Sequence, residues 1–163
     1  MKTLLILRHA KSSWKHLELV DHDRPLNKRG KRDAPYMGKL LRYKNLIPDM
    51  ILSSTAMRAL STAEAVAKVC GYKGEITLTS SFYQAGPEAY MEVLRRISDD
   101  CRIVLVVGHN PGLEELIEML TGEVRSMQTC TLSQVNLFIR RWEALNSDTK
   151  GKLIMVLQPR DVA

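Results

Sequence analysis

Three segments of the chain place cationic or imidazole side chains after short apolar runs. Arg8 and His9 follow a run of four apolar residues, and His109 lies one glycine beyond a run of five. Arg58 comes shortly after a third run. Burying an arginine is costly unless its guanidinium meets an anion. These side chains therefore predict an anion site, with two imidazoles available for chemistry.

Two arginines and two histidines beside predicted helix N-termini are typical of a pocket for a phosphoryl group. The planar guanidinium pairs with two phosphate oxygens at once, and the free N–H groups of a helix N-terminus favour anions. One imidazole can attack phosphorus to form a phosphohistidine, from which water releases phosphate. The remaining cations can spread the charge that develops on the phosphoryl oxygens. Because they supply that charge, neither a metal nor a cofactor is expected.

The apolar runs have the length and composition of buried strands. Residues 103–107 are all apolar, four of the five are β-branched and none is polar, which is typical of a central strand in a parallel sheet. Residues 4–7 and 50–52 are shorter runs of the same kind. Apolar residues at helical spacing occupy residues 60–70 and 113–120, and a glycine ends each stretch.

Strand and helix patterns alternate through most of the chain, which predicts an α/β fold. Residues 76–78 indicate a further strand. Near the C-terminus, residues 135–139 alternate in polarity and residues 153–157 are apolar, so we expect an antiparallel pair at one sheet edge. The prediction is a three-layer α/β/α sandwich with a mostly parallel central sheet. Ligands of such sheets bind beyond the carboxyl ends of the strands.

Two local features concern the helices near this edge. A basic helix is expected after Pro25, but Pro35 lies within it, and a proline inside a helix costs about 3 kcal/mol. The sequence therefore predicts a helix that either starts late, near Asp33, or kinks. The next helix is preceded by three N-cap candidates, Ser53, Ser54 and Thr55.

Four motifs occur in order along residues 1–120, and together they resemble the histidine phosphatase superfamily. The first motif reads Arg-His-Ala where the superfamily usually has Arg-His-Gly. This variant is similar to the small SixA-type branch, the phosphohistidine phosphatases. The motifs are Leu7-Arg8-His9-Ala10-Lys11-Ser12, Asp23-Arg24-Pro25-Leu26, Ser53-Ser54…Arg58…Thr62-Ala63 and Gly108-His109-Asn110-Pro111-Gly112.

The resemblance implies one histidine phosphatase domain, phosphoglycerate mutase-like, over residues 1–163. It also implies that Arg24, in the long loop, binds substrate, because this residue matches the Arg-Pro-Leu segment of the superfamily. The catalytic residues that it implies are His9 as the nucleophile and, as a clamp around the phosphoryl group, Arg8, Arg58 and His109.

The chain departs from larger members of the superfamily in its proton donor. Those proteins supply a glutamate after the third strand. Here that region holds Glu88, in a helix first turn where an acid also matches the helix dipole. Asp21, in the loop before Arg24, is the better candidate for a proton donor. Without the glutamate, we expect a preference for a P–N bond, because the imidazole of phosphohistidine has a conjugate acid with a pKa of roughly 6.5 and leaves readily.

The predicted function is that of a metal-independent phosphatase with a phosphohistidine enzyme intermediate, acting on phosphohistidine in a protein. A small-molecule phosphomonoesterase on the same fold and a non-catalytic phospho-binding module are the alternatives. Retention of His9 favours turnover, because binding requires only the cations. Residues 17–23 loosely resemble the Asp-x-Asp motif of Mg²⁺-dependent haloacid dehalogenase-type phosphatases, but the following Arg24-Pro25 does not fit that motif.

Composition indicates an ordinary globular protein with a basic surface. The 163 residues carry a net charge of +6, which suits an anionic partner, and no nucleic-acid-binding motif is present. No apolar run approaches the roughly 20 residues of a membrane span, and no export signal appears. Cys70, Cys101 and Cys130 lack metal-site spacing and are expected to be reduced, which favours the cytoplasm. His16 and His22 fall on no motif and receive no role.

Overall fold

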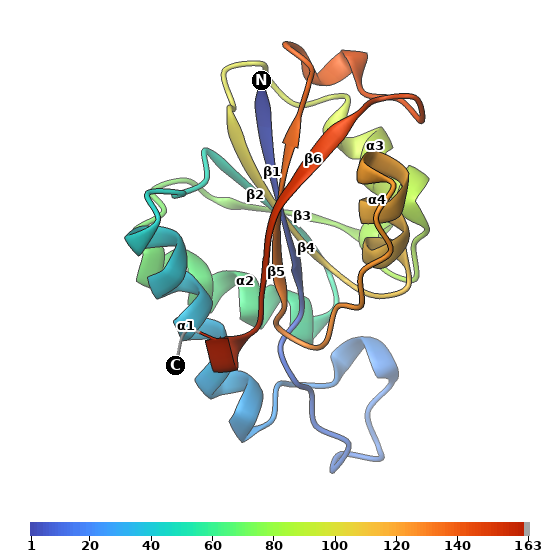
Figure 1. The fold of residues 1–163 in the computed structure, drawn as a ribbon. Coiled ribbons are helices and arrows are strands. Elements are labelled where there is room, and N and C mark those ends of the chain that lie inside the picture. The colour runs from blue at the N-terminus through green and yellow to red at the C-terminus, as the bar shows by residue number, and fades with distance from the viewer. Residues whose placement is uncertain (162–163) are drawn as a thin grey trace.

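The computed structural model describes residues 1–161 and contains one six-stranded sheet with helices on both faces (Figure 1). The sheet order is β3-β2-β4-β1-β5-β6. The strands are β1 (Lys2–Arg8), β2 (Met50–Ser54), β3 (Ile76–Thr79), β4 (Ile103–Gly108), β5 (Leu132–Leu137) and β6 (Gly151–Leu157). The helices are α1 (Lys28–Tyr43), α2 (Met57–Cys70), α3 (Pro87–Leu94) and α4 (Gly112–Thr121).

The sheet is mostly parallel, as predicted. Strands β3, β2, β4 and β1 run parallel to their neighbours, whereas β5 pairs antiparallel with β1 and β6 pairs antiparallel with β5. The carboxyl ends of β2, β4 and β1 are therefore adjacent at one edge. Within residues 1–161, no helix has the length and apolar character needed to cross a bilayer.

Two apolar layers hold the helices against the sheet. Helices α1 and α2 cover one face, and α3 and α4 cover the other (Figure 1). Strand β4 is buried at every position, with Val104 and Val106 facing the α3–α4 layer and Leu105 and Val107 facing the α1–α2 layer. This two-sided burial explains why β4 shows no polar alternation. The three-layer prediction is confirmed.

Of the two alternatives predicted for the first helix, the late start near Asp33 is wrong. Helix α1 begins at Lys28, where the side chain of Asn27 accepts a hydrogen bond from the Gly30 N–H (2.9 Å), and Pro35 lies inside the helix. Burial compensates for the proline. Met37 and Leu41 are fully buried, and each contributes roughly 1.5–3 kcal/mol, against about 3 kcal/mol for the proline.

The predicted capping of the second helix is also wrong. The N-cap residue of α2 is Ala56, which makes no side-chain capping bond. Ser54 instead accepts the Ala56 N–H (3.2 Å) and contacts His109. The predicted glycine ends are correct, because Gly71 and Gly122 both adopt positive φ (84° and 76°) at the ends of α2 and α4.

Candidate active site

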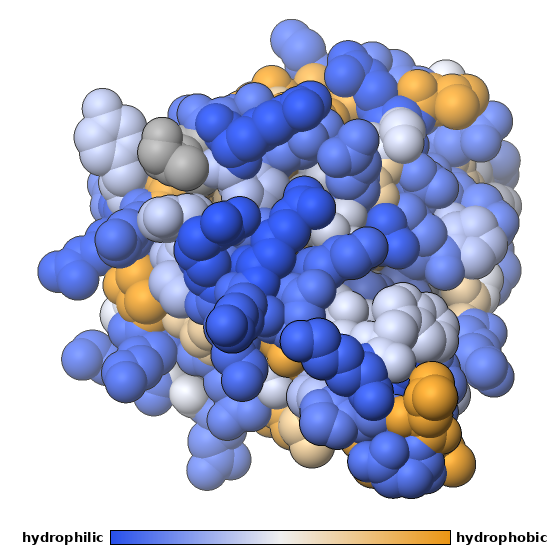
Figure 2. Space-filling view, turned by 90° about the horizontal axis from the view of Figure 1, so that it is seen from below, coloured by the Kyte–Doolittle hydropathy of each residue, from blue (hydrophilic) through white to orange (hydrophobic). Residues whose placement is uncertain are grey.

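A cavity of about 250 Å³ opens at the carboxyl ends of the central strands. The loop over residues 11–27 folds across this edge (Figure 1). Seen from below, hydrophilic side chains cover most of this face, with hydrophobic groups at its margin (Figure 2). The cavity brings together all six residues predicted for the site, namely Arg8, His9, Asp21, Arg24, Arg58 and His109.

His9 is held in one tautomer by a short backbone contact. Its Nδ1 lies 2.8 Å from the carbonyl oxygen of Ala10. A carbonyl can only accept, so Nδ1 must carry the proton and Nε2 keeps its lone pair. Burial, opposed by this hydrogen bond, lowers the pKa of His9 to about 3. His9 therefore has a neutral ring with a free nitrogen near neutral pH, which is the form that a nucleophile needs.

The end of β1 is fixed to α2 through Thr62, a residue of the third motif. The Thr62 hydroxyl accepts the Ala10 N–H (2.9 Å) and donates to the carbonyl oxygen of Arg58 (2.7 Å). Thr62 is fully buried. One hydroxyl thus connects Ala10, whose carbonyl orients His9, to the turn of helix that carries Arg58.

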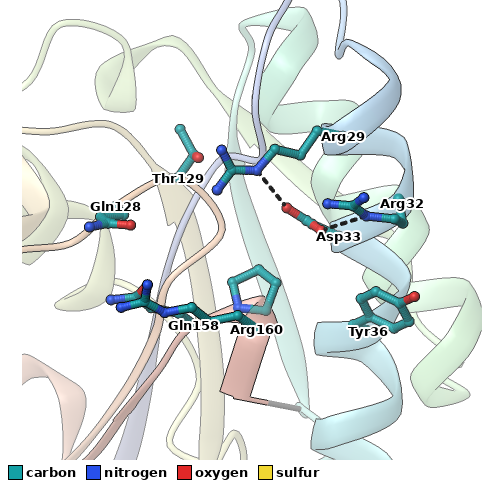
Figure 3. Close-up of a pocket in the computed structure, with 9 residues that line it drawn as sticks. Arg29, Arg32, Asp33, Tyr36, Gln128, Thr129, Gln158 and Arg160 are labelled. Carbon is teal, nitrogen blue, oxygen red and sulfur yellow. Dashed lines mark hydrogen bonds and ion pairs between the residues drawn. The ribbon is translucent and has the colours of Figure 1, made fainter. Parts of the chain in front are cut away.

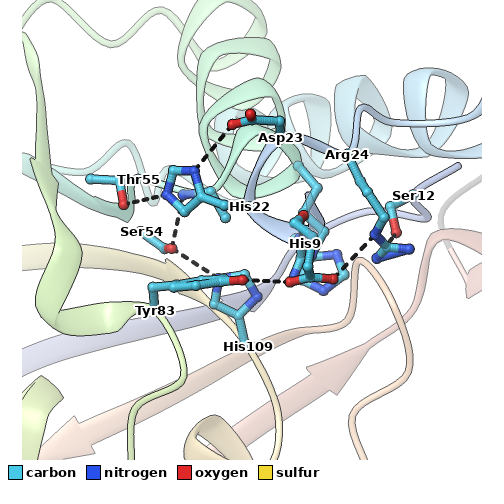
Figure 4. A network of polar contacts seen from close by, with 12 residues as sticks. His9, Ser12, His22, Asp23, Arg24, Ser54, Thr55, Tyr83 and His109 are labelled. Atoms are coloured by element: carbon cyan, nitrogen blue, oxygen red, sulfur yellow. Dashed lines mark hydrogen bonds and ion pairs between the residues drawn. The ribbon is translucent and has the colours of Figure 1, made fainter. Parts of the chain in front are cut away.

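His109 faces His9 across the cavity, with ring centroids 5.1 Å apart. Its Nε2 lies 2.9 Å from the Oγ of Ser54, at the end of β2 (Figure 4). The hydroxyl of Tyr90 accepts the His109 backbone N–H (3.2 Å). Burial first, and then the positive charge of Arg58, lowers the pKa of His109 to about 4.

Several buried donors around the cavity have no hydrogen-bond partner among residues 1–161. They are the Nε atoms of Arg8 and Arg58 and the Nη1 of Arg24, and the Nδ1 ring nitrogen of His109 is unpaired as well. An unsatisfied buried polar group costs about 1–3 kcal/mol, and more when it is charged. Such a concentration of unmet donors at one cavity is typical of a site whose ligand supplies the acceptors. A phosphoryl group, with its several oxygens, matches this need.

Asp21 lies between two of these arginines. Arg58 donates from Nη1 to the Asp21 carbonyl (2.8 Å) and from Nη2 to its carboxylate (3.0 Å). The Nε of Arg24 lies 3.2 Å from the other carboxylate oxygen as an ion pair. Tyr83 donates its hydroxyl proton to the same carboxylate (2.6 Å). Asp21 thereby ties the long loop to α2 and to the segment after β3.

The environment of Asp21 does not favour its predicted role as a proton donor, and that role stays a prediction. The hydrogen bond from Tyr83, followed by the contacts with Arg58, holds the pKa of this carboxyl below its ordinary value. Asp21 is therefore ionised near neutral pH and has no proton to give. Its carboxylate instead accepts hydrogen bonds and orients the two arginines.

Three side chains at the site carried no predicted role. Tyr83 comes from the segment that supplies glutamate in larger superfamily members, and it packs edge-on against His22 (4.9 Å between centroids). His22 is held by Thr55 (2.8 Å) (Figure 4). Trp14 lies under the guanidinium of Arg24, whose Cζ is 3.5 Å from the ring centroid. No local pattern distinguished these residues from ordinary loop residues.

Two alternatives raised by the sequence do not match the structure. Glu88 lies in the first turn of α3, is exposed and pairs with Arg95 (3.8 Å), as its dipole-matching interpretation predicts. Asp21 and Asp23 form a short 3₁₀ turn in the long loop and do not end a strand of the sheet. Within residues 1–161, no three His, Cys, Asp or Glu side chains group in a way that could hold a metal ion.

The lowered histidine pKa values predict that acid destabilises the fold. Between an unfolded pKa of roughly 6.5 and folded values of about 3 for His9 and about 4 for His109, the unfolded chain binds more protons. The free energy of unfolding should therefore fall as the pH falls through this window. Urea unfolding at pH 7, 6, 5 and 4 measures the slope, which should be shallower in H9Q. Equal slopes for H9Q and the wild-type protein would contradict the buried neutral ring.

Comparison with known proteins agrees with the fold. The model of the histidine phosphatase superfamily (branch 1) matches residues 4–83. An uncharacterised chloroplastic protein of Arabidopsis thaliana is 34% identical over 151 residues, covering 87% of this chain and 69% of that protein. A structure assigned to phosphohistidine phosphatase SixA of Agrobacterium tumefaciens has a TM-score of 0.82 and 28% identity, covering 97% and 98% of the two chains. Its counterpart from Nakamurella multipartitia has a TM-score of 0.86 and 25% identity, covering 97% and 96%.

An α/β sandwich with two histidines and three arginines around a cavity at one edge of its sheet, matched in this way, defines the class of protein. The chain belongs to the histidine phosphatase superfamily, and its likeness to phosphatases of this fold supports phosphatase activity. Within the superfamily, the likeness over nearly the full length of both SixA structures places it in the SixA-type branch.

Proposed function

We propose that this protein removes phosphate from phosphohistidine displayed on a protein, through a covalent phosphoenzyme on His9. The observation that carries the proposal is the Nδ1 contact of His9 with the Ala10 carbonyl, which leaves Nε2 as the nucleophile. Around that nitrogen, the arginines offer unmet donors to a phosphoryl group, and His109 lines the same cavity.

The proposed reaction has two steps at phosphorus. Nε2 of His9 attacks, a P–N bond to the enzyme forms, and the bond from phosphorus to the substrate nitrogen breaks. The departing imidazole takes a proton from water. A second water then attacks phosphorus, the bond to Nε2 breaks, and phosphate leaves with the proton passing to solvent. Arg8, Arg24, Arg58 and His109 hold the phosphoryl oxygens throughout.

The surroundings of Arg8 suit this clamp. Its Nη1 donates to the carbonyl oxygen of Met127 (3.1 Å), which fixes the guanidinium at the end of β1. Asn110 donates from its side-chain nitrogen to the same carbonyl (2.7 Å). The fourth motif, which carries His109, therefore shares one backbone acceptor with the first motif. A clamp that is rigid before the reaction costs no reorganisation when charge develops.

The proposal that the enzyme cleaves a P–N bond rests on which carboxylic acids line the cavity and on their protonation. Among the described residues that line it, Asp21 is the one carboxylic acid, and its lowered pKa keeps it ionised. An alkyl phosphate needs a strong proton donor, because its leaving alkoxide has a parent pKa near that of water, about 15.7. Imidazole leaves with the help of solvent, since its conjugate acid has a pKa of roughly 6.5.

A protein substrate is supported by the rim of the cavity. Trp14, Leu17 and Val20, on the long loop, are 69%, 89% and 66% exposed. Exposed apolar groups gathered beside a site are typical of surfaces that contact another protein. The cavity volume of about 250 Å³ suits one phosphoryl group and its imidazole better than a large metabolite.

The proposal is tested by comparing leaving groups on the wild-type enzyme. We expect kcat/KM for phosphoramidate and for a phosphohistidine protein to exceed that for glycerol phosphate by at least about 10²-fold, the scale on which general acid catalysis acts. Nitrophenyl phosphate, with an acidic leaving group, should fall between them. Equal or better turnover of glycerol phosphate would overturn the proposal, because it would require a proton donor.

A further inference from the structure

A second cavity, of about 310 Å³, lies beside the candidate active site. It is formed between α1, the turn before β5 and the segment after β6 (Figure 3). The side chain of Arg29 extends from α1 toward Thr129 on the opposite wall (Figure 3). Its polar lining consists of charged side chains and neutral ones, namely Arg29, Arg32, Asp33, Arg160, Gln128, Thr129 and Gln158.

Thr129 lines both this cavity and the catalytic one. The turn that carries it is fastened to the nucleophile strand. The carbonyl of Met127 accepts from Arg8 (3.1 Å), and the Cys130 N–H contacts the carbonyl oxygens of Arg8 and His9 (3.1 and 3.0 Å). One short turn therefore forms part of the wall of each cavity. A molecule whose phosphoryl group lies at His9 can place a neighbouring group in the second cavity.

The charge of this cavity is positive, and one buried acid organises it. Asp33 accepts from the Nε of Arg29 (3.4 Å) and from the Nε of Arg32 (3.3 Å), and its side chain is only 5% exposed. The contacts found among residues 1–161 use only the Nε atom of each arginine, so the two Nη groups of each remain available as donors. With Arg160, three guanidinium groups and one carboxylate line the cavity.

The two α1 arginines remain reachable from solvent. Their side chains are 53% and 62% exposed, although Asp33 fixes the inner end of each guanidinium. Gln128, Gln158 and Thr129 add neutral groups that can both donate and accept hydrogen bonds. Guanidinium groups that are held at Nε and open at Nη match the paired oxygens of a carboxylate or a phosphate.

We propose that this second cavity is an anion subsite, which binds a carboxylate or phosphate group of the substrate beside the phosphohistidine. The inference rests on the proposed function, since it assigns the flanking chemistry of the same substrate. It predicts that the enzyme prefers phosphohistidine with an acidic neighbour. The subsite lies outside the reacting atoms, so it contributes to KM and leaves kcat nearly unchanged.

Binding of unphosphorylated peptides tests the subsite apart from catalysis. Three fluorescein-labelled peptides share one sequence except at one cluster of residues. The cluster consists of Asp and Glu in the first peptide, of Asn and Gln in the second, and of phosphoserine in the third. We expect R29Q/R32Q to bind the Asp/Glu peptide about 10-fold or more weakly than the wild-type protein does, which corresponds to about 1.4 kcal/mol. Its affinity for the Asn/Gln peptide should be unchanged. Any binding of a peptide in the catalytic cavity is common to R29Q/R32Q and the wild-type protein, so it cancels when their affinities are compared. The phosphoserine arm shows whether carboxylate or phosphate is preferred.

The matched control is K31Q/R42Q, which removes the same charge from exposed positions of α1 outside both cavities. If the control loses as much affinity for the Asp/Glu peptide as R29Q/R32Q does, the proposal is overturned in favour of general electrostatic attraction. R29Q/R32Q leaves Asp33 without its arginines, so R160Q is the second variant, which keeps both contacts to Asp33. R160Q should also weaken the acidic peptide, and normal binding in both variants would overturn the subsite.

Kinetics then separate this inference from the proposed function. On phosphoramidate, which has no flanking group, R29Q/R32Q should match the wild-type enzyme within about twofold. On a phosphohistidine peptide with acidic neighbours, its KM should rise by about 10-fold at constant kcat. Failure of the wild-type enzyme to hydrolyse either substrate would refute the proposed function while the peptide-binding result still stands. Equal loss on phosphoramidate and peptide would refute the subsite alone.

Discussion

H9A is expected to lose at least about 10³-fold in kcat on phosphoramidate, because removal of a nucleophile leaves only binding and charge stabilisation. In the wild-type protein, rapid quench with labelled substrate should trap a phosphoenzyme that is labile to acid and stable to base, as expected of a phosphoramidate on histidine. The same experiment on H9A should trap no label. The physical basis is the free Nε2 that results when Nδ1 donates to Ala10.

The matched control is H16A, which makes the same change at a histidine whose side chain is 51% exposed and lies outside the catalytic cavity. H16A should retain both turnover and the trapped label. H109A should still form the phosphoenzyme, but more slowly, because His109 is proposed to bind the phosphoryl group without forming a bond to it. Label that persists in H9A would remove His9 from the nucleophile role.

R58A is expected to lower kcat/KM by about 10²-fold or more, the scale of losing one group that stabilises transition-state charge. Arg58 is 7% exposed and reaches the cavity from the first turn of α2. Its positive charge also lowers the pKa values of both His9 and His109. The acid limb of the kcat/KM profile should therefore shift to higher pH in R58A, because each imidazole then protonates more easily.

The pH shift distinguishes loss of charge from loss of structure. R58K keeps a positive charge but lacks the planar fork, so it should recover the pH profile better than the rate. R96A, at an exposed arginine that pairs with Glu92, is the matched control and should behave as wild type. Full activity in R58A would show that the N-terminus of α2 is not part of the catalytic site.

The sequence alone predicted the sheet and the residues at its edge. Two-sided burial of a strand imposes an apolar run, which made β4 visible without an alignment. Because the carboxyl ends of adjacent parallel strands meet at one edge, the residues after those runs could be placed together. Arg8, His9 and His109 were predicted in this way, since a few residues connect each to its strand.

Helix ends were harder to predict from sequence, because they depend on competing local and tertiary terms. Pro35 suggested a late start, but the packing of Met37 and Leu41 outweighs the cost of the proline. Ser53, Ser54 and Thr55 were the candidates to cap α2, but the N-cap is Ala56, and the Ser54 hydroxyl contacts His109. In both cases a long-range contact decided the outcome, and a sequence window does not contain that contact.

Tertiary structure alone decided the protonation and the roles of the loop residues. Asp21 was a reasonable donor by position, but two arginines and Tyr83, distant in sequence, lower its pKa. The second cavity depends in the same way on α1 and the turn at Thr129, which are about a hundred residues apart. Short strand-linked motifs are encoded locally. The charge states of the site residues are decided only when separate segments meet, because electrostatic interactions depend on distance through space. The wall that the two cavities share is formed in the same way, by segments that are distant in sequence.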